Sequence, residues 1–430
     1  MKKTFIFFSL LIMFARAGYA GGNVNSFTLS NGIKVLHKLN TTNPLVSVQV
    51  FINCGSLGET PEQAGIAHFT QNMMLYGTKN RTAKQIAQDT EDIGTEITGE
   101  AHSDYSSLGI SMISKNFDRA VEILSDIIKN PIFPSDEIEK ERSNTLASIK
   151  ARKDRIFSVA DDLLNETMYG NHPYSWPGVG KKETVSKFSR ENIVKWHKIN
   201  YVSNNMFIVT AGSISKNDLK NSLEKYFSDI EKNDISSVSH NAPEKLLKEV
   251  KKENNKFKQA YLVIGYPAPE SDCQDYATLK MLNSYLGGRM SGVLFTELRE
   301  NLSLAYEVGC AYPTRKEQSK FFFYIGLDKK NIGLAKDRIF KILDNLKKDP
   351  IPKKELADTK NHIKGSYLID HQTIGKQAWY LGWWEIMGKG FKYDEKYIDD
   401  LMSVSAKDIQ KCVKKYFSDK YVSVEIIPQK

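Results

Sequence analysis

The sequence predicts an α+β protein made of two homologous domains, each a sheet covered by helices. Two pairs of similar segments indicate an internal duplication. "FSRENIVKWHKINYVSNNMFIVTAG" begins at Phe188, and "VSAKDIQKCVKKYFSDKYVSVEIIP" begins 216 positions later at Val404. "IFPSDEIEKERSNTL" and "DPIPKKELADTKNHI" form the second pair, at nearly the same offset. The strongest strand candidates, "LVSVQVFINCG" and "QAYLVIGYPAP", lie near the start of each half.

The first pair of segments predicts a helix and then a strand in each half. Ser189 and Ser405 suit helix N-caps, and the helical patterns end at Tyr201 and Phe417. Alternating apolar residues follow, as in a strand with one buried face. The second pair places a proline before a long helix, where the missing N–H of proline needs no partner.

These repeats divide the mature chain into two domains of about 200 residues each. We predict an N-terminal domain at residues 21–231, a polar linker at 232–245 and a C-terminal domain at 246–430. The linker has the sequence "KNDISSVSHNAPEK".

Residues 1–20 have the pattern of a secretory signal peptide. Lys2 and Lys3 precede an apolar run, and small residues lie near Ala20. The run of about ten residues is shorter than the roughly twenty that span a bilayer, although a retained N-terminal anchor is an alternative. No later stretch is long and apolar enough to span. We therefore expect a periplasmic protein, exported through a cleavable signal peptide, with no stable membrane insertion.

Charge and cysteine content exclude several classes of function. The formal net charge is +9, but basic residues are interleaved with acidic and polar ones, so a nucleic-acid partner is not expected. The chain has four cysteines, far apart and without a C-x-x-C pair, and therefore shows no cysteine zinc site. The spacing leaves their disulfide state open.

The segment "GIAHFTQNMMLYGT", residues 65–78, predicts a helix that lacks part of a metal site. Two histidines at i and i+4 share a helix face and can hold one zinc ion, while a Glu at i+3 activates the bound water. Here His68 opens the pattern, but Gln71 stands at the position of the base and Asn72 at that of the second histidine. An amide cannot accept a proton near neutral pH. The composition alone also fits a structural histidine.

The longer segment "GSLGETPEQAGIAHFTQNMMLYGTKNRT" resembles the active-site segment of the pitrilysin–insulysin zinc metallopeptidases, in the processing-peptidase-like branch. The resemblance extends along the mature chain and implies two duplicated domains that form one half of a clamshell. It also implies a third zinc ligand, a Glu, at a position where this chain has Ser148 in "ERSNTLASI". The upstream acidic residue of the family is kept as Glu141. We therefore expect no metal in this chain.

The family's substrate-pairing edge strand matches "TGEAHSDYS", residues 98–106. Thr98 and Gly99 depart from the Asn-Ala of the family, which puts substrate pairing there in doubt. His102 lies nearby, and a rearranged zinc site with His68, His102 and an acid is an alternative to complete loss of the metal.

The second domain keeps the family's other functional pair. In "LGGRMSGVLFTELRENLSLAYEVGCAYP", Arg299 lies near the end of a helical pattern and Tyr306 begins a strand seven positions later. The resemblance implies that this pair contacts the substrate backbone across a closed chamber. A guanidinium and a phenol can donate hydrogen bonds to a peptide carbonyl and to the oxyanion that forms during hydrolysis.

These features together predict a non-catalytic, exported subunit of a heterodimeric zinc metallopeptidase. Such a subunit encloses peptide substrate and donates Arg299 and Tyr306, while a homologous partner chain supplies zinc and base. The alternative is a periplasmic peptide-binding or scaffold protein with no role in hydrolysis. Hydrolysis by the chain alone would need a metal site that its residues do not provide.

Overall fold

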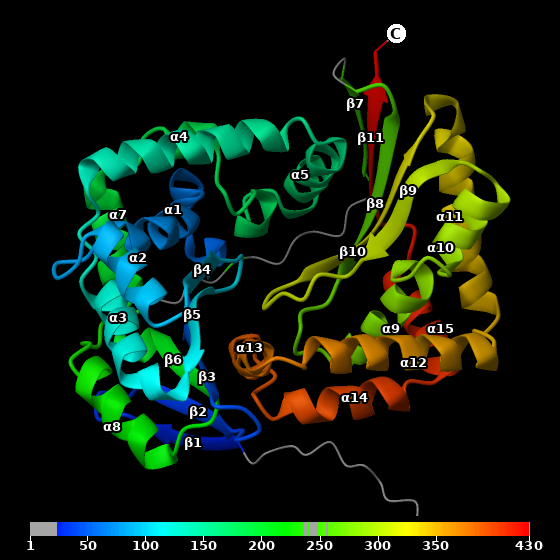
Figure 1. The fold of residues 1–430 in the computed structure, drawn as a ribbon. Coiled ribbons are helices and arrows are strands. Elements are labelled where there is room, and N and C mark those ends of the chain that lie inside the picture. The colour runs from blue at the N-terminus through cyan, green and yellow to red at the C-terminus, as the bar shows by residue number, and fades with distance from the viewer. Residues whose placement is uncertain (1–23, 236–239, 241–247, 255–256, 430) are drawn as a thin grey trace, which may run out of the picture.

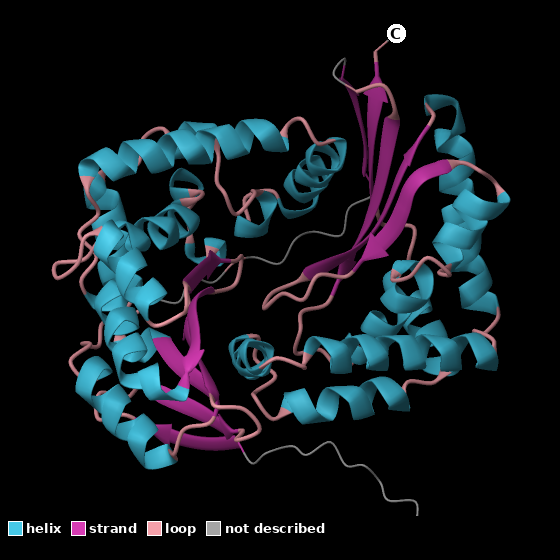
Figure 2. Ribbon diagram, in the orientation of Figure 1, coloured by secondary structure: helices cyan, strands magenta, loops and turns pink. Residues whose placement is uncertain are grey.

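The protein consists of two α+β halves that lie side by side, each with one sheet and a set of helices (Figure 2). The computed structural model describes residues 24–235, 240, 248–254 and 257–429. The predicted signal peptide, residues 1–20, lies outside this range, as does most of the predicted linker.

The first sheet has six strands in the order β1-β2-β6-β3-β5-β4, with β2 and β6 parallel and the other pairs antiparallel. The strands are β1 (Val24–Thr28), β2 (Lys34–Leu39), β3 (Leu45–Ile52), β4 (Ile97–Ala101), β5 (Ser106–Ile113) and β6 (Met206–Gly212). The helices of this half are α1 (Ile66–Met73), α2 (Ala83–Asp92), α3 (Phe117–Lys129), α4 (Ser135–Arg152), α5 (Ile156–Tyr169), α6 (Lys182–Val185), α7 (Arg190–Asn200) and α8 (Lys216–Phe227). Short 3-10 turns are η1 (Ser56–Gly58), η2 (Pro61–Gln63), η3 (Met74–Tyr76), η4 (Ser114–Asn116), η5 (Pro173–Ser175) and η6 (Ser203–Asn205).

The second sheet repeats this order with one strand fewer, as β7-β11-β8-β10-β9. Its strands are β7 (Lys248–Asn254), β8 (Ala260–Ala268), β9 (Ala305–Ala311), β10 (Ser319–Leu327) and β11 (Val422–Pro428). The helices are α9 (Tyr276–Gly287), α10 (Val293–Phe295), the π-helix η7 (Thr296–Asn301), the 3-10 turn η8 (Lys329–Asn331), α11 (Ile332–Lys348), α12 (Lys353–Asp370), α13 (Ile374–Ile386), α14 (Tyr393–Ser403) and α15 (Ala406–Tyr416). The parallel pair β7–β11 corresponds to β2–β6, which supports the duplication.

The repeated helix–strand units have the predicted caps. The Ser189 side chain accepts from the N–H of Asn192 at the start of α7, and Ser405 accepts from the N–H of Asp408 at the start of α15. The prolines before the long helices are the N-cap residues of α4 and α12. The strand predicted at Met206, Ile208 and Thr210 is present as β6, and all seven of its residues are buried, so both of its faces are covered.

The reason for this burial is that each sheet is covered on its second face by a helix from the other half. The second-half helix α13 packs against β3 and β6, and the first-half helix α5 packs against β8 and β11 (Figure 1). These two helices occupy equivalent places in the duplication, since each directly follows the long helix that begins after a proline. We call them the exchanged helices.

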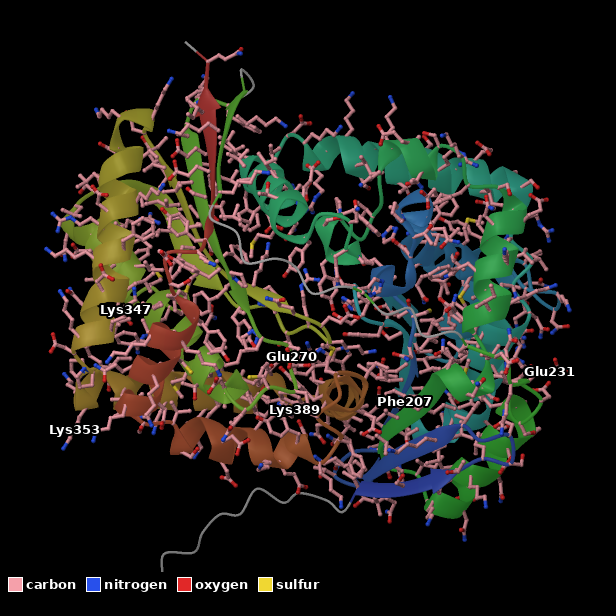
Figure 3. The ribbon with its side chains drawn as sticks, turned by 180° about the vertical axis from the view of Figure 1, so that it is seen from behind. Phe207, Glu231, Glu270, Lys347, Lys353 and Lys389 are labelled. Atoms are coloured by element: carbon pink, nitrogen blue, oxygen red, sulfur yellow. The ribbon has the colours of Figure 1, made fainter. Side chains whose placement is uncertain are left out.

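The contact between α13 and the first sheet is close. Gly382 lies against Phe51, since a Cβ at 382 would come 2.0 Å from the Phe51 ring. Phe51 stacks on Phe207 with ring centroids 5.3 Å apart, and Figure 3 shows Phe207 beside α13. Lys34 of β2 forms an ion pair with Glu385 of α13 at 2.5 Å.

The contact of α5 with the second sheet is equally close. A Cβ at Gly265 of β8 would lie 2.9 Å from a methyl group of Leu164 in α5. Buried Lys320 of β10 donates to Asn165 of α5 at 2.6 Å and forms an ion pair with Asp161. The halves therefore share two cores, one at each exchanged helix.

Candidate functional site

The helix that resembles a zinc helix is α1, and its start is held by a buried carboxylate. Gly65 precedes the helix with φ of 99°, a conformation that favours glycine. Glu59 accepts from the N–H groups of Gly65 and Ala67 at 2.9 and 3.0 Å, and from the indole of Trp176 at 3.0 Å. Burial nevertheless raises the pKa of Glu59 to about 7. These contacts satisfy N–H groups that a helix start leaves without partners.

Gln71, at the position of the catalytic base, is turned into the protein. Its side chain is 1% exposed. The carboxamide Oε1 accepts from the hydroxyl of Tyr201 at 2.6 Å, and Nε2 donates to the carbonyl of Ser107 at 3.2 Å. Both ends of the amide have partners, so Gln71 serves as a bridge between α1, β5 and the end of α7.

Gly99 of the edge strand β4 lies directly against this amide. A Cβ at Gly99 would come 2.8 Å from Nε2 of Gln71, which is too close for a real side chain. Alanine at position 99 would therefore require the Gln71 amide to shift. The sequence contained both substitutions but gave no sign that they touch.

Asn72, at the position of the second zinc histidine, binds a carboxylate instead. Its Nδ2 donates to Glu141 of α4 at 2.8 Å. Thr145 donates to the same oxygen of Glu141 at 3.0 Å, and Tyr76 contacts the other at 3.5 Å. Glu141 is 5% exposed, so its charge is stabilised by these donors and not by solvent.

His68 remains near this network without joining it. Its Nδ1 is buried and has no hydrogen-bond partner among the described residues. Burial lowers the pKa of His68, and the Glu141 charge opposes the change. Ser148, at the position of the third ligand, is exposed on α4. The residues at the family's zinc positions therefore do not fit a zinc ion: one imidazole remains, and the nearest carboxylate is occupied by neutral donors.

The alternative site with His102 is not assembled either. Nε2 of His102 lies 2.9 Å from Glu100 in an exposed pair. Among the described residues, the cluster of three or more potential metal ligands lies elsewhere and includes neither His68 nor His102. After His102, Asp104 and Tyr105 are both buried, and Asp104 accepts from the N–H of Lys316 in the second half at 3.0 Å.

Arg299 and Tyr306 are both exposed, and the structure places them on neighbouring elements of the second half. Arg299 belongs to η7, where its guanidinium lies 5.1 Å from the ring centroid of Phe295. Tyr306 lies on β9, an edge strand of the second sheet, and is 65% exposed. With the described residues, neither side chain forms a hydrogen bond or an ion pair, so both keep donors for an external acceptor.

The backbone between these two residues is irregular. Arg299 sits in a π-helical turn. Such turns are rare in proteins, but those that occur are often found at functional sites. Ser303 has φ of 53°, which is uncommon for a residue other than glycine. The N–H of Leu304 donates to the carbonyl of Leu298 at 2.8 Å and closes the turn. The helical pattern in the sequence predicted neither irregularity.

Comparison with known proteins connects this geometry to one family. Residues 34–180 match the family model described as Insulinase (Peptidase family M16), and residues 187–363 match Peptidase M16 inactive domain. A Bacillus subtilis protein named uncharacterized zinc protease YmxG is 28% identical over 408 residues, which cover 94% of this chain and 98% of that protein. An uncharacterized zinc protease of Rickettsia felis is 28% identical over 417 residues, with the same coverage of both chains.

Two solved structures share the fold. A protease from Helicobacter pylori superposes with a TM-score of 0.88 at 20% identity, covering 95% of this chain and all of that one. A peptidase M16 inactive domain from Pseudomonas fluorescens gives a TM-score of 0.88 at 21% identity, covering 95% of this chain and 99% of that one. At these identities the likeness establishes the arrangement of two sheets and their helices.

Proposed function

The chain belongs to the insulinase family of peptidases, family M16, in its non-catalytic branch, and from this premise we propose that it is the accessory subunit of an exported heterodimeric zinc metallopeptidase. A homologous partner chain with an intact His-x-x-Glu-His helix supplies the zinc ion and the general base. This chain encloses peptide substrate and donates Arg299 and Tyr306 to the partner's active site.

The main support is the contrast between two groups of side chains. Gln71 and Asn72 have internal partners and are used in packing, whereas Arg299 and Tyr306 are exposed without partners among the described residues. Exposed donors held next to a constrained backbone are suited to a peptide carbonyl or an oxyanion. A scaffold protein without a role in hydrolysis would not need both donors free.

Export is proposed from residues 1–20, with the periplasm as the compartment. Among the described residues, no helix is long and apolar enough to cross a membrane. In this proposal, α1 of this chain holds no zinc ion.

Reconstitution tests the proposal. The mature chain is mixed with a homologue that has an intact zinc motif and is encoded in the same genome, and hydrolysis of unfolded and short peptides is measured. We expect little activity from this chain alone and more from the mixture than from the homologue alone. Stable binding of peptides without any gain in hydrolysis would contradict the accessory role and favour the peptide-binding alternative.

A further inference from the structure

Three potential metal ligands from distant parts of the chain meet where the two halves touch. His172 caps the short turn η5 of the first half, and Glu317 lies in the loop between β9 and β10 of the second half. His240 comes from the connection between the halves, where it is described although residues 236–239 and 241–247 are not. These three residues lie outside the zinc helix, the edge strand and the Arg299–Tyr306 segment described above.

The three side chains converge at ligand distances. Nε2 of His172 lies 2.7 Å from Oε2 of Glu317, and Nδ1 of His240 lies 3.2 Å from Oε1. One ligand atom from each residue lies within 4.8 Å of the other two. The His172 side chain is 3% exposed, that of His240 12% and that of Glu317 32%. The cluster is thus largely enclosed but open to solvent at the carboxylate.

Two imidazoles and one carboxylate form a donor set that binds zinc in proteins, with a fourth position for water. Tetrahedral bonds of about 2.0–2.1 Å place neighbouring ligand atoms about 3.3 Å apart. The distance from His240 Nδ1 to Oε1 of Glu317 is close to this value, whereas His172 Nε2 lies about 0.6 Å closer to the other oxygen, Oε2, so the carboxylate would have to turn and His172 move back for an ion to fit. Solvent reaches the cluster from the side of Glu317, from which a water could approach an ion.

The position of Glu317 is fixed by contacts that do not involve the cluster. Its N–H donates to the hydroxyl of Tyr174 at 3.3 Å. The neighbouring Lys316 donates from its backbone N–H to Asp104 at 3.0 Å and from Nζ to the carbonyl of Asp104 at 3.0 Å. A ligand that is already ordered loses less conformational entropy when the ion binds.

A simple hydrogen-bonded cluster is the competing interpretation. Nδ1 of His172 accepts from the N–H of Tyr174 at 3.1 Å, so in the unliganded ring Nε2 carries the proton and donates it to Glu317. Metal binding at Nε2 would move this proton to Nδ1 and break the Tyr174 contact. Three hydrogen bonds, from Tyr174 to His172 and from each imidazole to Glu317, are then exchanged for three coordinate bonds, and the zinc measurement described below decides between the two states.

Two charge effects bear on the ligands. Burial lowers the pKa of His172, and the hydrogen bond to Glu317 opposes this change. The Arg315 guanidinium, 4.0 Å from the Tyr174 ring centroid, opposes a second cation nearby, while Glu317 brings a negative charge to the ion itself.

We propose that His172, His240 and Glu317 bind one divalent transition-metal ion of the zinc class, which ties the β9–β10 loop of the second half to the first half. Borderline ions such as zinc suit imidazole with carboxylate, whereas magnesium prefers an all-oxygen shell. The site is separate from α1 and requires no catalytic step.

Zinc content of the full mature chain tests this site. The protein is stripped with a chelator, incubated with zinc chloride and desalted, and metal is measured by elemental analysis. Wild type should retain one zinc per chain, and His240→Ala and Glu317→Gln should retain none. Glu317→Gln keeps an acceptor for His172, so it provides a folded variant even where removal of an imidazole disturbs the loop.

Two histidine variants are controls. His102→Ala removes one member of an exposed His–Glu pair, and His68→Ala removes the remaining family ligand; both should keep the zinc. Zinc should raise the melting temperature of wild type and not that of His240→Ala, and magnesium should raise neither. The proposal is overturned if wild type retains no zinc, if His240→Ala and Glu317→Gln retain it, or if His68→Ala loses it.

Discussion

Gln71 lies so close to Gly99 that a Cβ at position 99 would come 2.8 Å from its Nε2. The amide cannot move away freely, because Tyr201 and Ser107 hold its two ends. Two departures from the family pattern, one on a helix and one on an edge strand, are therefore in direct contact. The side chain that would activate water in an active relative is used here to join α1 to the sheet.

This relationship predicts strong coupling between the two positions. Gly99→Ala should displace Gln71, break its bond to Ser107 and lower the free energy of unfolding by about 1–2 kcal/mol. In a Gln71→Ala background the same Gly99→Ala change should cost much less, since the obstructing amide is gone. Urea denaturation of the four proteins measures the coupling energy. Equal costs in both backgrounds would show that the two side chains do not interact.

Restoring the base alone should harm the protein. Glu at position 71 would point a carboxylate oxygen at the carbonyl of Ser107, where the amide now donates, and should destabilise the fold by about 1–3 kcal/mol. Urea denaturation of Gln71→Glu at neutral pH measures this loss. Unchanged stability would mean that the side chain at 71 can leave its buried position.

Restoring all three lost positions should rebuild metal binding. We expect Gln71→Glu, Asn72→His and Ser148→Glu together to bind zinc at α1, with Glu141 accepting from the new histidine. The measurement uses a His240→Ala background, so that zinc at the proposed inter-half site does not contribute. Addition of His68→Ala should abolish the gain. Zinc-free protein after all three changes would indicate that the helix geometry has diverged too.

Arg299 and Tyr306 should affect activity and not stability. Because both are exposed without partners among the described residues, Arg299→Ala and Tyr306→Phe should change the unfolding free energy by less than about 0.5 kcal/mol. In the reconstituted pair, each substitution should lower kcat/KM by an amount that corresponds to a loss of about 1–3 kcal/mol of transition-state stabilisation. Arg338→Ala is the matched control, since Nη1 of Arg338 lies 3.6 Å from Oε1 of Glu297, which belongs to the same π-helical turn as Arg299. Donation is refuted if the two variants match wild type in the pair.

The exchanged helix α13 should not tolerate a methyl group where it meets the first sheet. Gly382→Ala would place a Cβ 2.0 Å from the Phe51 ring, which the stacked Phe207 prevents from moving away. We expect a loss of about 1–3 kcal/mol by overpacking. Gly365→Ala in α12 is the control: nothing lies within 4 Å of its Cβ, and alanine should stabilise this helix by up to about 1 kcal/mol. We expect the urea midpoint to decrease for Gly382→Ala and to increase for Gly365→Ala.

His197 should make stability depend on pH. Burial lowers the pKa of His197 to about 4. The unfolded chain therefore binds a proton below about pH 6.5 that the folded chain does not bind until about pH 4, and stability falls as the pH decreases between these values. The free energy of unfolding falls by up to about 3 kcal/mol, because each unit of difference between the unfolded and folded pKa contributes 1.36 kcal/mol. His197→Gln, which can still donate to the Ile128 carbonyl, should lack this part of the decrease. Parallel pH profiles of the two proteins would contradict the assignment.

Local chemistry made part of the fold predictable. Ser189 and Ser405 cap their helices as expected, because a cap depends on residues three positions apart. The burial of both faces of β6 was not predictable in this way. The covering helix comes from residues 374–386, and nothing in either segment specifies which sheet a helix will cover.

The candidate site shows the same limit. Gln71 and Asn72 revealed the loss of zinc chemistry because the motif is contiguous. Their new partners, Tyr201 and Glu141, are 130 and 69 positions away. His172, His240 and Glu317 are likewise far apart in the sequence. They converge only because of the way in which the two halves pack against each other. The signal peptide at residues 1–20 stays a prediction.

The exchange of α5 and α13 also bears on the origin of the chain. A single ancestral half would expose the sheet face that the exchanged helix now covers, an apolar surface that two copies could bury by swapping that helix. Gene fusion of such a swapped homodimer gives the present arrangement without any change of contact. Within this one chain, the two halves are therefore packed as two swapped copies of a single half would be.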